Sequence, residues 1–477
     1  MKPAGNPNTA PAFSPAARHF DPAILREYDI RGQIGKNLGE GDAFTLGLAF
    51  GSFVKDRGGE RFCVGYDGRH SSPSLAEALI EGLKTTGAQV ENIGLGPTPM
   101  LYFAVKERGA DAGIMVTGSH NPADYNGFKM ALCDGPVFGE TIQTLGRIAA
   151  EGTFAQGEGR VETLDIRARY TERLLADLTN TRPLKIAWDA GNGAAGEILE
   201  RLTASLPGEH ILLYEDIDGA FPNHHPDPTV DKNLDDLIQT VLAQGCDLGI
   251  AFDGDGDRIG VVDEKGHILR CDTLMTIYAH DVLKDHPGAP IIGDVKCSQV
   301  MFDEIERLGG QPVMWKTGHS LVKAKMAELK APLAGELSGH IFFADRYYGY
   351  DDALYCAVRL INALQDNSGT GLSALTAHLP VLFNTPEVRV EVEEEKKFAL
   401  VPQIIEHLRA QDTPGVMLDT IDGVRVKTAD GWWLLRPSNT QNVLVARAES
   451  RSAEGLERLI DMACAEVTRL GYRIEFP

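Results

Sequence analysis

The sequence predicts an α/β protein with three related mixed α/β domains followed by a C-terminal α+β domain. Short apolar segments alternate with helical patterns as far as about residue 383, and one glycine-containing frame recurs along that stretch. From about residue 384 the alternation gives way to a different pattern of strands and an amphipathic helix. Strand–helix alternation is typical of parallel sheets that carry helices on both faces.

The alternation is clearest in the first half of the chain. Apolar runs predict strands at 61–67 (RFCVGYD), 111–116 (DAGIMV), 184–193 (LKIAWDAGNG) and 247–257 (DLGIAFDGDGD). Between the first two, the periodic spacing of apolar residues in 72–87 (SPSLAEALIEGLKTTG) predicts a helix.

A frame of the form G-x-D-x-G-I begins at Gly109 and again at Gly245, and two apolar residues follow it in both places. Polar glycine loops come next, at 117–119 (TGS) and 253–255 (DGD). A weaker version of the frame occurs in 331–340 (APLAGELSGH). Chance similarity between buried strands is the alternative explanation. Because ligands bind beyond the carboxyl ends of strands in such sheets, we expect these loops to contact a ligand.

The segment after residue 384 predicts a separate domain. We expect an exposed strand at 386–395 (PEVRVEVEEE), a strand pair at 423–438 and an amphipathic helix at 452–471. Residues 1–20, rich in Pro, Ala and Asn, predict a flexible tail. The expected domains therefore span residues 21–165, 166–267, 268–383 and 384–477. The first contains the polar loop at Ser119, called the serine loop below, and the second contains the polar loop that begins at Asp253, called the aspartate loop.

Composition excludes several classes of protein. Lys and Arg number 46 against 68 Asp and Glu, a net charge of −22. A nucleic-acid-binding scaffold needs clustered cations, whereas a small anionic substrate responds to local charge. No apolar run approaches the roughly 18 residues that span a bilayer, and the N-terminus lacks the apolar core of a signal peptide. The seven widely spaced cysteines include no C-x-x-C pair and indicate free thiols. We therefore expect a cytoplasmic protein without membrane or nucleic-acid partners.

The strongest local signal is the run DGDGDR at 253–258. Its carboxylates, Asp253, Asp255 and Asp257, repel one another unless a cation lies between them, and hard oxygen ligands suit Mg²⁺ or Ca²⁺. An EF-hand loop is one alternative, but Arg258 stands where that loop needs glycine and the flanks predict strands. A nucleophilic Asp253, as in phosphoaspartyl enzymes, is another.

Ser119 lies in a second glycine loop, next to His120. A serine beside a histidine suggests acyl transfer, but the G-x-S-x-G elbow is absent because neither flanking position is glycine. We expect instead that Pro122 starts a helix and that Ser119 lies exposed near its N-terminus, where a phosphate can bind. An ordinary helix-capping turn is the alternative.

Two further loops carry ligand-binding side chains. Glu336 and Ser338 place a carboxylate and a hydroxyl on one tight turn, where they can hydrogen-bond neighbouring sugar hydroxyls. Arg436 offers a fork for two phosphate oxygens, and the residues 438–440 (Ser-Asn-Thr) add neutral donors. A capped turn is the alternative explanation of this last loop. Four regions of the chain thus supply a metal site, a serine and two ligand loops.

This combination resembles the α-D-phosphohexomutase superfamily, and most closely its bacterial bifunctional phosphomannomutase/phosphoglucomutase branch. The matching motifs occur in the family's order from about residue 24 to residue 445: YDIRG (28–32), TGSHNP (117–122), FPNHHPDP (221–228), DGDGDR (253–258), DVKC (294–297), WKTGHS (315–320), GELSGH (335–340) and RPSNT (436–440). TGSHNP together with DGDGDR is highly specific. The resemblance implies four domains around a central cleft, of which three are related.

The resemblance also implies roles for the matched residues. Ser119 is the residue that becomes phosphorylated, and Mg²⁺ is held by Asp253, Asp255, Asp257 and a phosphoserine oxygen. The implied proton-transfer and charge-stabilising residues are Lys129, His340 and Arg31. Further implied residues line the catalytic site: Arg258, His120, Tyr28, Lys296 and His319. Glu336 and Ser338 contact the sugar. The phosphate that is not transferred is bound by Arg436, Ser438, Asn439 and Thr440.

The implied reaction moves a phosphoryl group between the 1- and 6-oxygens of mannose, glucose or both. It passes through a hexose 1,6-bisphosphate that turns end for end, so the domain after residue 384 is expected to close over the ligand. Sugar phosphates are the expected partners of a monomer, with a dimer as the alternative. The alternative functions are a phosphoglucosamine mutase, a Mg²⁺-dependent sugar phosphatase that uses Asp253, and a regulatory or Ca²⁺-binding relative without turnover.

Overall fold

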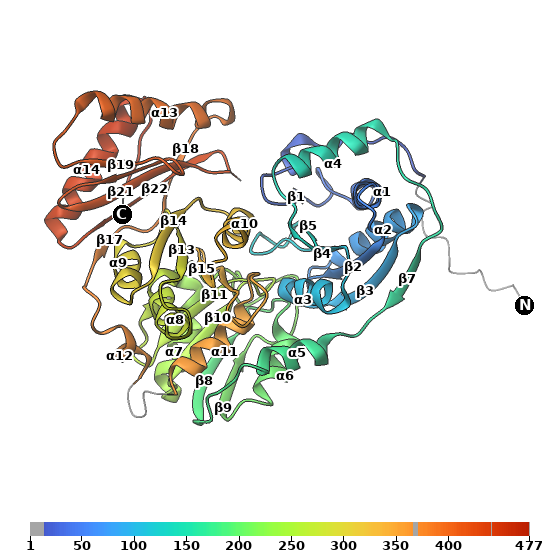
Figure 1. Ribbon diagram of the computed structural model, residues 1–477, viewed down its shortest axis with the longest axis horizontal. Coiled ribbons are helices and arrows are strands. Elements are labelled where there is room, and N and C mark those ends of the chain that lie inside the picture. The colour runs from blue at the N-terminus through green and yellow to red at the C-terminus, as the bar shows by residue number, and fades with distance from the viewer. Residues whose placement is uncertain (1–13, 366–370, 440, 477) are drawn as a thin grey trace, which may run out of the picture. The chain divides into compact units, whose positions relative to one another are not determined.

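The computed structural model describes residues 14–365, 371–439 and 441–476, which form four β-sheets with their helices (Figure 1). The chain divides into two compact units. The first comprises residues 14–166 with Asp218–Ala220, and the second comprises Arg167–Ile217 with the chain from Phe221 onward. One sheet belongs to the first unit and three sheets belong to the second.

The first unit contains, in chain order, η1 (Pro22–Ile24), β1 (Ile30–Gln33), α1 (Glu40–Lys55), β2 (Arg61–Tyr66), α2 (Ser72–Thr85), β3 (Gln89–Leu95), α3 (Thr98–Arg108), β4 (Ala112–Val116), β5 (Tyr125–Leu132), β6 (Gly135–Pro136), α4 (Glu140–Glu151) and β7 (Arg160–Thr163). Its seven strands form one sheet in the order β1-β5-β4-β2-β3-β7, with β6 paired to β5. β2 pairs parallel with β3 and β4, whereas β5 pairs antiparallel with β1 and β4.

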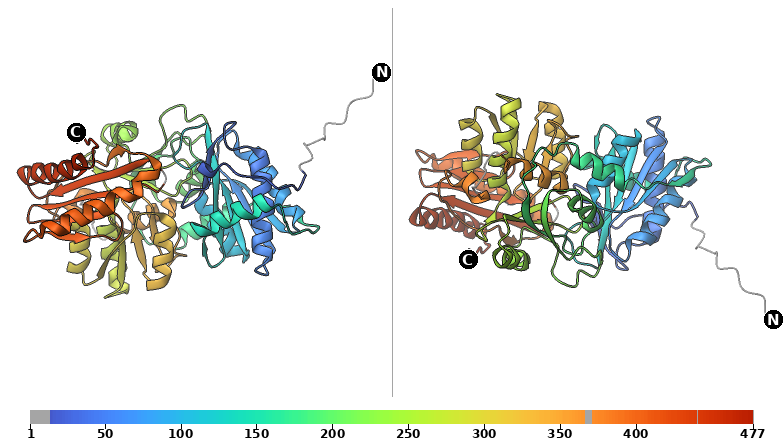
Figure 2. Two further views of the ribbon diagram at one scale, coloured as in Figure 1. Left: turned by 90° about the horizontal axis from the view of Figure 1, so that it is seen from above. Right: turned by 90° about the horizontal axis from the view of Figure 1, so that it is seen from below.

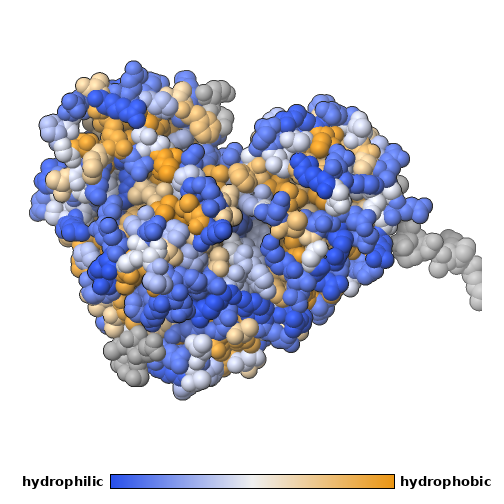
Figure 3. Space-filling view, viewed as in Figure 1, coloured by the Kyte–Doolittle hydropathy of each residue, from blue (hydrophilic) through white to orange (hydrophobic). Residues whose placement is uncertain are grey.

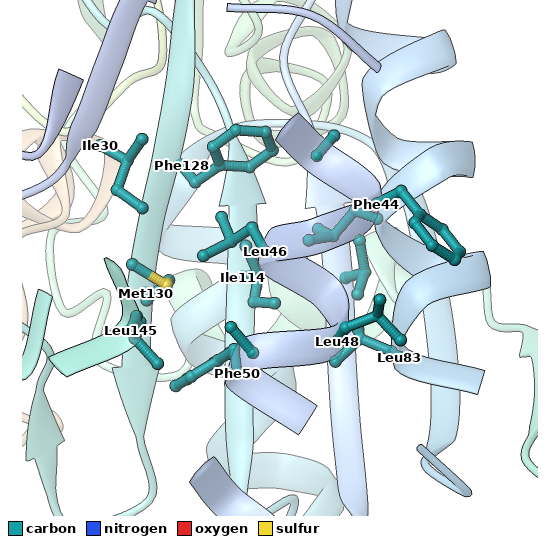
Figure 4. Packing of buried hydrophobic residues seen from close by; sticks show 14 of the residues in the cluster. Ile30, Phe44, Leu46, Leu48, Phe50, Leu83, Ile114, Phe128, Met130 and Leu145 are labelled. Carbon is teal, nitrogen blue, oxygen red and sulfur yellow. The ribbon is translucent and has the colours of Figure 1, made fainter. Parts of the chain in front are cut away.

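Helices cover both faces of this sheet. On one face, Leu46 and Phe50 of α1 belong to the same buried cluster as Ile114 of β4 and Phe128 of β5 (Figure 4). Residues of α2 and α4 belong to this cluster as well. On the other face, α3 lies against Gly113 of β4. Because successive strand residues point to opposite faces, this alternation keeps β4 buried on both sides.

The helices α1 and α2 approach each other through two glycines. A Cβ atom on Gly47 would lie 2.3 Å from the carbonyl oxygen of Leu79, and one on Gly82 would lie 2.1 Å from that of Phe44. No larger side chain fits at either position without moving a helix. The two backbones are therefore in direct contact over the sheet that carries the serine loop.

The second unit begins with a five-stranded sheet in the order β12-β11-β10-β8-β9. Its elements are α5 (Arg167–Leu175), β8 (Leu184–Asp189), α6 (Gly196–Thr203), β9 (Gly208–Leu213), η2 (Asp231–Leu234), α7 (Asp235–Gln244), β10 (Leu248–Phe252), β11 (Ile259–Asp263) and β12 (Ile268–Leu269).

A four-stranded sheet in the order β14-β13-β15-β16 follows. Its elements are α8 (Cys271–Asp285), β13 (Pro290–Asp294), α9 (Gln299–Arg307), β14 (Gln311–Trp315), α10 (His319–Leu329), β15 (Leu333–Gly335), β16 (Ile341–Phe343), α11 (Ala353–Ala363) and α12 (Leu372–Thr376).

The three sheets described so far share one strand order, and this confirms the predicted relationship between them. The corresponding strands are β3-β2-β4-β5, β9-β8-β10-β11 and β14-β13-β15-β16. In each sheet the last two strands are antiparallel neighbours joined by one of the glycine loops, at 117–124, 253–258 and 336–340. These antiparallel pairs make the sheets mixed, because the loops are shorter than the dozen or so residues that a parallel crossover needs.

The C-terminal part has a six-stranded sheet in the order β17-β22-β21-β20-β19, with β18 paired to β22. Its elements are β17 (Phe383–Asn384), β18 (Val388–Glu391), α13 (Glu394–Gln411), β19 (Met417–Asp419), β20 (Val424–Lys427), β21 (Gly431–Pro437), β22 (Val443–Ser450) and α14 (Ala453–Arg469). α13 and α14 pack on the same face of the sheet around one buried cluster that includes Ile404, Trp433 and Leu459 (Figure 2).

Two sequence-based boundaries need correction. The strand expected at 386–395 ends at Glu391, which pairs with Val443 at the start of β22, so the partner strand extends no further. The flexible tail was expected over residues 1–20, but its last residues are held against the first unit. Residues 1–13 lie outside the described part of the chain, but the Arg18 amide donates to the Ala149 carbonyl and Phe20 is buried.

The state of the cysteines and the polarity of the surface match what we expected from the composition. All seven cysteines are free thiols. Hydrophilic residues prevail on the face shown in Figure 3, where hydrophobic residues form small separate patches. Within residues 14–365, 371–439 and 441–476, no helix has the length and apolar character required to cross a bilayer.

Replacing Gly47 by alanine should destabilise the first unit, because the added methyl group must push α2 away from α1. We expect the free energy of unfolding to fall by about 1–3 kcal/mol, the usual cost of overpacking. Gly41→Ala is a control in the same helix, since its Cβ would meet only the end of the exposed Arg18 side chain. Thermal unfolding followed by circular dichroism compares them, and equal melting temperatures would contradict the tight crossing.

Candidate active site

Ser119 lies in the loop 117–124 between β4 and β5, within the first unit. Its φ angle is 50°, in the left-handed region that residues other than glycine rarely adopt. The Ser119 amide donates to the Thr117 hydroxyl at 2.8 Å. The Ser119 hydroxyl lies 3.2 Å from Nδ1 of His120. The turn therefore holds the serine backbone in a strained conformation and places an imidazole beside its hydroxyl.

The surroundings of Ser119 differ from the sequence prediction. No helix starts at Pro122, and β5 begins at Tyr125 instead. Ser119 is also buried, with 1% of its surface exposed. The physical reason is the antiparallel return of the chain, which leaves only a short turn between β4 and β5. No helix therefore begins within this loop.

Other residues expected at the serine loop lie on neighbouring strands. Nη1 of Arg31, on β1, donates to the Gly118 carbonyl at 3.1 Å and to the Asn121 side chain at 2.7 Å. The other terminal nitrogen of Arg31 pairs with Asp29. Lys129 is buried on β5, in register with Met115 of β4. Tyr28 is partly buried just before β1. The first unit thus brings together Ser119, His120 and Arg31.

Two buried residues that the sequence analysis did not single out also support this loop. Asp67 accepts hydrogen bonds from the Thr117 hydroxyl at 2.8 Å and the Gly118 amide at 3.1 Å. Arg69 donates to main-chain carbonyls of the same loop. The available signal was the Asp-Gly-Arg run at 67–69, which begins at the last residue of the predicted strand 61–67, where polar side chains meet the ligand end of a sheet.

The aspartate loop joins β10 to β11 in the second unit, and these flanking strands exclude an EF-hand. Oδ1 of Asp253 accepts the amides of Asp257 and Arg258, both at 3.1 Å, which closes the turn. Gly256 has a φ of 74°, which permits the sharp reversal. Asp253, Asp255 and Asp257 are fully buried, and one carboxylate oxygen of each lies within 4.8 Å of the others.

This triplet has the properties of a site for a hard divalent cation. Buried carboxylates need compensation, and their oxygens are the ligands that such ions prefer. A second group within ligating distance, Asp257, His340 and Asp351, fits a cation less well. Nζ of Lys323 lies 2.9 Å from Oδ1 of Asp351, and Nε of Arg258 lies 3.2 Å from Nε2 of His340. Cationic side chains thus already accompany the second group.

His340 lies between two carboxylates. Its Nε2 is 3.3 Å from Oδ1 of Asp257, and its Nδ1 is 3.2 Å from Oε2 of Glu336. Burial and the Arg258 charge lower the pKa of His340, but the two carboxylates outweigh them and raise it to about 9. The Ser338 hydroxyl lies 3.0 Å from the same Nδ1. The residues expected to contact the sugar and to move a proton therefore share one hydrogen-bonded cluster.

Asp422 connects the loop at 336–340, expected to contact the sugar (the sugar loop), with the segment that begins at Arg436, expected to bind phosphate (the phosphate loop). Oε1 of Glu336 accepts the Gly318 amide at 2.5 Å. The neighbouring Thr317 amide donates to Oδ2 of Asp422 at 3.0 Å, and Nε of Arg436 donates to the same oxygen at 2.9 Å. Asp422 was not predicted, because its partners are remote in the sequence. The second unit thus brings the aspartate, sugar and phosphate loops into one continuous set of polar contacts.

The phosphate loop lies between β21 and β22. Arg436 and Ser438 are buried, and the Ser438 hydroxyl accepts the Gln441 amide at 3.1 Å. Asn439 is partly exposed. Thr440, which was predicted with them, lies outside the described residues.

Lys296 and His319 lie beside this set of contacts. Burial lowers the pKa of Lys296, but Glu387 at 2.7 Å and Asp294 at 3.9 Å outweigh it and raise the pKa. Lys296 is therefore a permanent cation and not a base. The ring of His319 lies 5.4 Å from that of His340, and its Nδ1 is 3.7 Å from Asp351. Both predicted residues are thus in the same region as Glu336.

The chain matches four domain families in order. They are described as phosphoglucomutase/phosphomannomutase alpha/beta/alpha domain I (residues 22–156), domain II (168–266), domain III (270–383) and C-terminal domain (387–466). Together they include the serine, aspartate, sugar and phosphate loops.

Similar proteins cover nearly the whole chain. A phosphomannomutase/phosphoglucomutase of Pseudomonas aeruginosa is 46% identical over 437 residues, which are 92% of this chain and 94% of the relative. A phosphoglucomutase of Neisseria meningitidis is 41% identical over 440 residues, or 91% and 95% of the two chains. A crystal structure of a phosphoglucomutase/phosphomannomutase family protein from Burkholderia thailandensis has a TM-score of 0.89 and 43% identity, and covers 96% of this chain and 100% of its own.

In protein treated with a chelator, we expect His340 to titrate near pH 9, because Asp257 and Glu336 favour its charged form. An unperturbed histidine titrates near pH 6.5. The raised pKa means that protonated His340 stabilises the fold fully below about pH 6.5 and that this contribution is lost as the pH rises through about 9. Nitrogen NMR of the imidazole measures the titration, and His340→Gln assigns the signal. If His340 titrated near pH 6.5 in the metal-free protein, the two carboxylates would not be raising its pKa.

Proposed function

The chain belongs to the phosphoglucomutase/phosphomannomutase family and is an isomerase of hexose phosphates, and from this premise we propose how it acts. A phosphoryl group moves between the 1- and 6-oxygens of one hexose through phosphorylated Ser119 and a hexose 1,6-bisphosphate. The observation that carries the proposal is the continuous polar network in the second unit, which joins Asp257, His340, Glu336, Asp422 and Arg436. It supports a single site for a metal, a sugar and a phosphate.

We assign substrate binding to the sugar and phosphate loops. Glu336 and Ser338 both contact Nδ1 of His340, which limits their movement before the sugar arrives. Arg436 is oriented by Asp422 and takes the phosphate that is not being transferred, together with Ser438, Asn439 and Thr440. Mannose and glucose phosphates differ only at the 2-hydroxyl. We propose that both are accepted, since failure to recognise one group costs little discrimination.

The proposed reaction also requires cations that offset the negative charge of the phosphoryl group. Asp253, Asp255 and Asp257 would hold Mg²⁺ together with the phosphate on Ser119. When bound there, Mg²⁺ offsets the negative charge of the phosphoserine and of the Asp257 carboxylate beside His340. Arg258 and Lys296 line the site as further cations, and Lys129 and Arg31 stabilise charge at the serine loop. Phosphoryl transfer relies mainly on such positioning and electrostatic stabilisation.

A base must accept the proton of the attacking sugar hydroxyl, and His340 and Lys129 are the two candidates. We favour His340, because an unperturbed imidazole titrates near neutral pH and Mg²⁺ in the aspartate loop would offset Asp257, one of the two carboxylates that raise the pKa of His340 in the metal-free protein. Its contacts with Asp257 and Glu336 stabilise the protonated form after transfer. The protonated imidazole can then return the proton when the sugar oxygen becomes the leaving group.

The bisphosphate must turn end for end, so the phosphate loop has to accept either end of the sugar. We propose that the part after residue 384 moves for this step. Its contact with the 294–297 loop combines a small apolar cluster of Val295, Trp432 and Leu434 with hydrogen bonds. Arg425 donates to the carbonyls of Val295 and Cys297 at 2.8 and 2.9 Å. Arg447 donates to the Lys296 carbonyl. An interface within a chain permits relative motion of its parts unless it is large and hydrophobic, and the apolar cluster in this contact is small.

Ser119→Ala tests the proposed function. Glucose 1,6-bisphosphate carrying a radioactive phosphate should label the wild type and not the variant, and mutase turnover of glucose and mannose 1-phosphates should fall by about 10³-fold or more, as for a lost nucleophile. Ser74→Ala, in α2 of the same unit, is the control and should behave as the wild type. Undiminished labelling of the alanine variant would exclude Ser119 as the acceptor.

Arg436→Met should weaken substrate binding with less effect on turnover. The loss of a charged hydrogen bond is worth roughly 1.5–3 kcal/mol, which corresponds to a KM about 10- to 100-fold higher. Steady-state kinetics with hexose 1-phosphate measures it. Arg409→Met, exposed on α13, is the control. An unchanged KM for the Arg436 variant would remove Arg436 from the phosphate site.

A further inference from the structure

The buried Arg69 guanidinium grips the main chain of the serine loop. Arg69 follows β2, and only 1% of its surface is exposed. Its terminal nitrogens donate to carbonyl oxygens of the turn, at 2.7 Å to Ser119, 2.6 Å to Asn121, 2.6 Å to Pro122 and 3.0 Å to Tyr125. A planar fork with several N–H groups can reach all of these acceptors at once, which a lysine ammonium on its single stem cannot do.

Asp67 orients this guanidinium and contacts the other end of the loop. Its Oδ2 lies 3.1 Å from Nε of Arg69 and accepts the Thr117 hydroxyl at 2.8 Å. Oγ1 of Thr117 in turn accepts the Ser119 amide at 2.8 Å. The amide of Ser119 is therefore held through Thr117, and its carbonyl is held by Arg69. Both peptide groups that flank the Ser119 side chain are restrained.

The glycine in the loop is explained by the same contact. A Cβ atom on Gly118 would lie 2.4 Å from Nε and 2.5 Å from Cζ of Arg69. The guanidinium thus occupies the space that any larger residue would need. The positive φ of Ser119 costs conformational energy, and such a residue persists only where its surroundings determine it strongly. Arg69, Asp67 and Thr117 are those surroundings.

We propose that Arg69, oriented by Asp67, is a positioning residue that holds Ser119 in its left-handed conformation during phosphoryl transfer. The hydrogen bonds that Arg69 and Thr117 make here engage the carbonyl and the amide of Ser119, so these two bonds do not depend on whether the hydroxyl carries a phosphate. The loop therefore keeps one geometry while the phosphoryl group leaves and returns. The inference rests on the proposed role of Ser119, because in-line transfer requires the hydroxyl to be held in place.

Arg69→Met and Arg69→Lys test the proposal in the full chain. We expect kcat to fall on the order of 100-fold in both, the usual effect of misplacing a reacting group by about 1 Å. KM for hexose 1-phosphate should stay within about two-fold, because the sugar and phosphate loops belong to the second unit. Arg61→Met is the control. Arg61 begins the same strand, and its guanidinium also donates to carbonyls, those of Arg108 and Gly109.

Two further measurements separate positioning from folding. Measured well below each variant's melting temperature, hydrogen exchange of peptides covering 117–127 should rise more than that of other peptides in both Arg69 variants and should not rise in Arg61→Met. Thr117→Val is a milder variant that keeps the shape of the side chain but removes the acceptor for the Ser119 amide. If Arg69→Met does not fold, Thr117→Val decides: lower kcat with retained KM supports the proposal, and wild-type kcat overturns it.

Full activity of Arg69→Lys would overturn the proposal, because charge alone would then suffice. Wild-type kcat and exchange in a folded Arg69→Met would overturn it as well. A wild-type protein without turnover or Ser119 labelling would instead refute the proposed function. The exchange measurement would still decide whether Arg69 restrains the loop.

Discussion

The burial of many carboxylates in one region is the constraint on which the second unit depends. Asp257 and Glu336 lie on either side of His340, and Asp351 lies beside Lys323. An uncompensated buried charge is strongly unfavourable, so each acidic group must have a cation or amide within reach. These requirements connect loops that are remote in the sequence. The residues that compensate one another's charge are also the residues assigned to the metal, the sugar and the proton.

A repeated piece of backbone geometry brings these groups to equivalent places. In three sheets the chain leaves a buried strand, forms a short polar loop and returns along the neighbouring strand in the antiparallel direction. The loops carry a serine, an aspartate triplet and a glutamate, so the same frame presents different chemistry. The fourth sheet differs in topology, and Arg436, the arginine proposed to bind phosphate, joins the others through Asp422. Asp422 accepts hydrogen bonds from Nε of Arg436 and from the Thr317 amide, and the neighbouring Gly318 amide donates to Glu336.

Much of this could be expected from the sequence where the signal is local. The strands at 61–67 and 111–116 and the helix at 72–87 follow from periodicity, and the structure confirms them within one or two residues. The aspartate triplet is visible because its members lie within five residues of one another. The helix expected after Pro122 was wrong, because a proline that can start a helix can equally stand in a tight turn. Only the pairing of β4 with β5 distinguishes the two.

The sequence by itself determined which residue types occur in each loop, and therefore the chemistry that is available: a hydroxyl, three carboxylates, a glutamate and an arginine. The tertiary structure decided which buried groups support them. Arg69 is remote in sequence from the turn it holds, and His340 acquires its raised pKa from Asp257 on another sheet. Periodicity and spacing report only on neighbours along the chain. Hydrogen bonds and charge compensation act through space, so their partners exist only once the strands have paired and the sheets have packed.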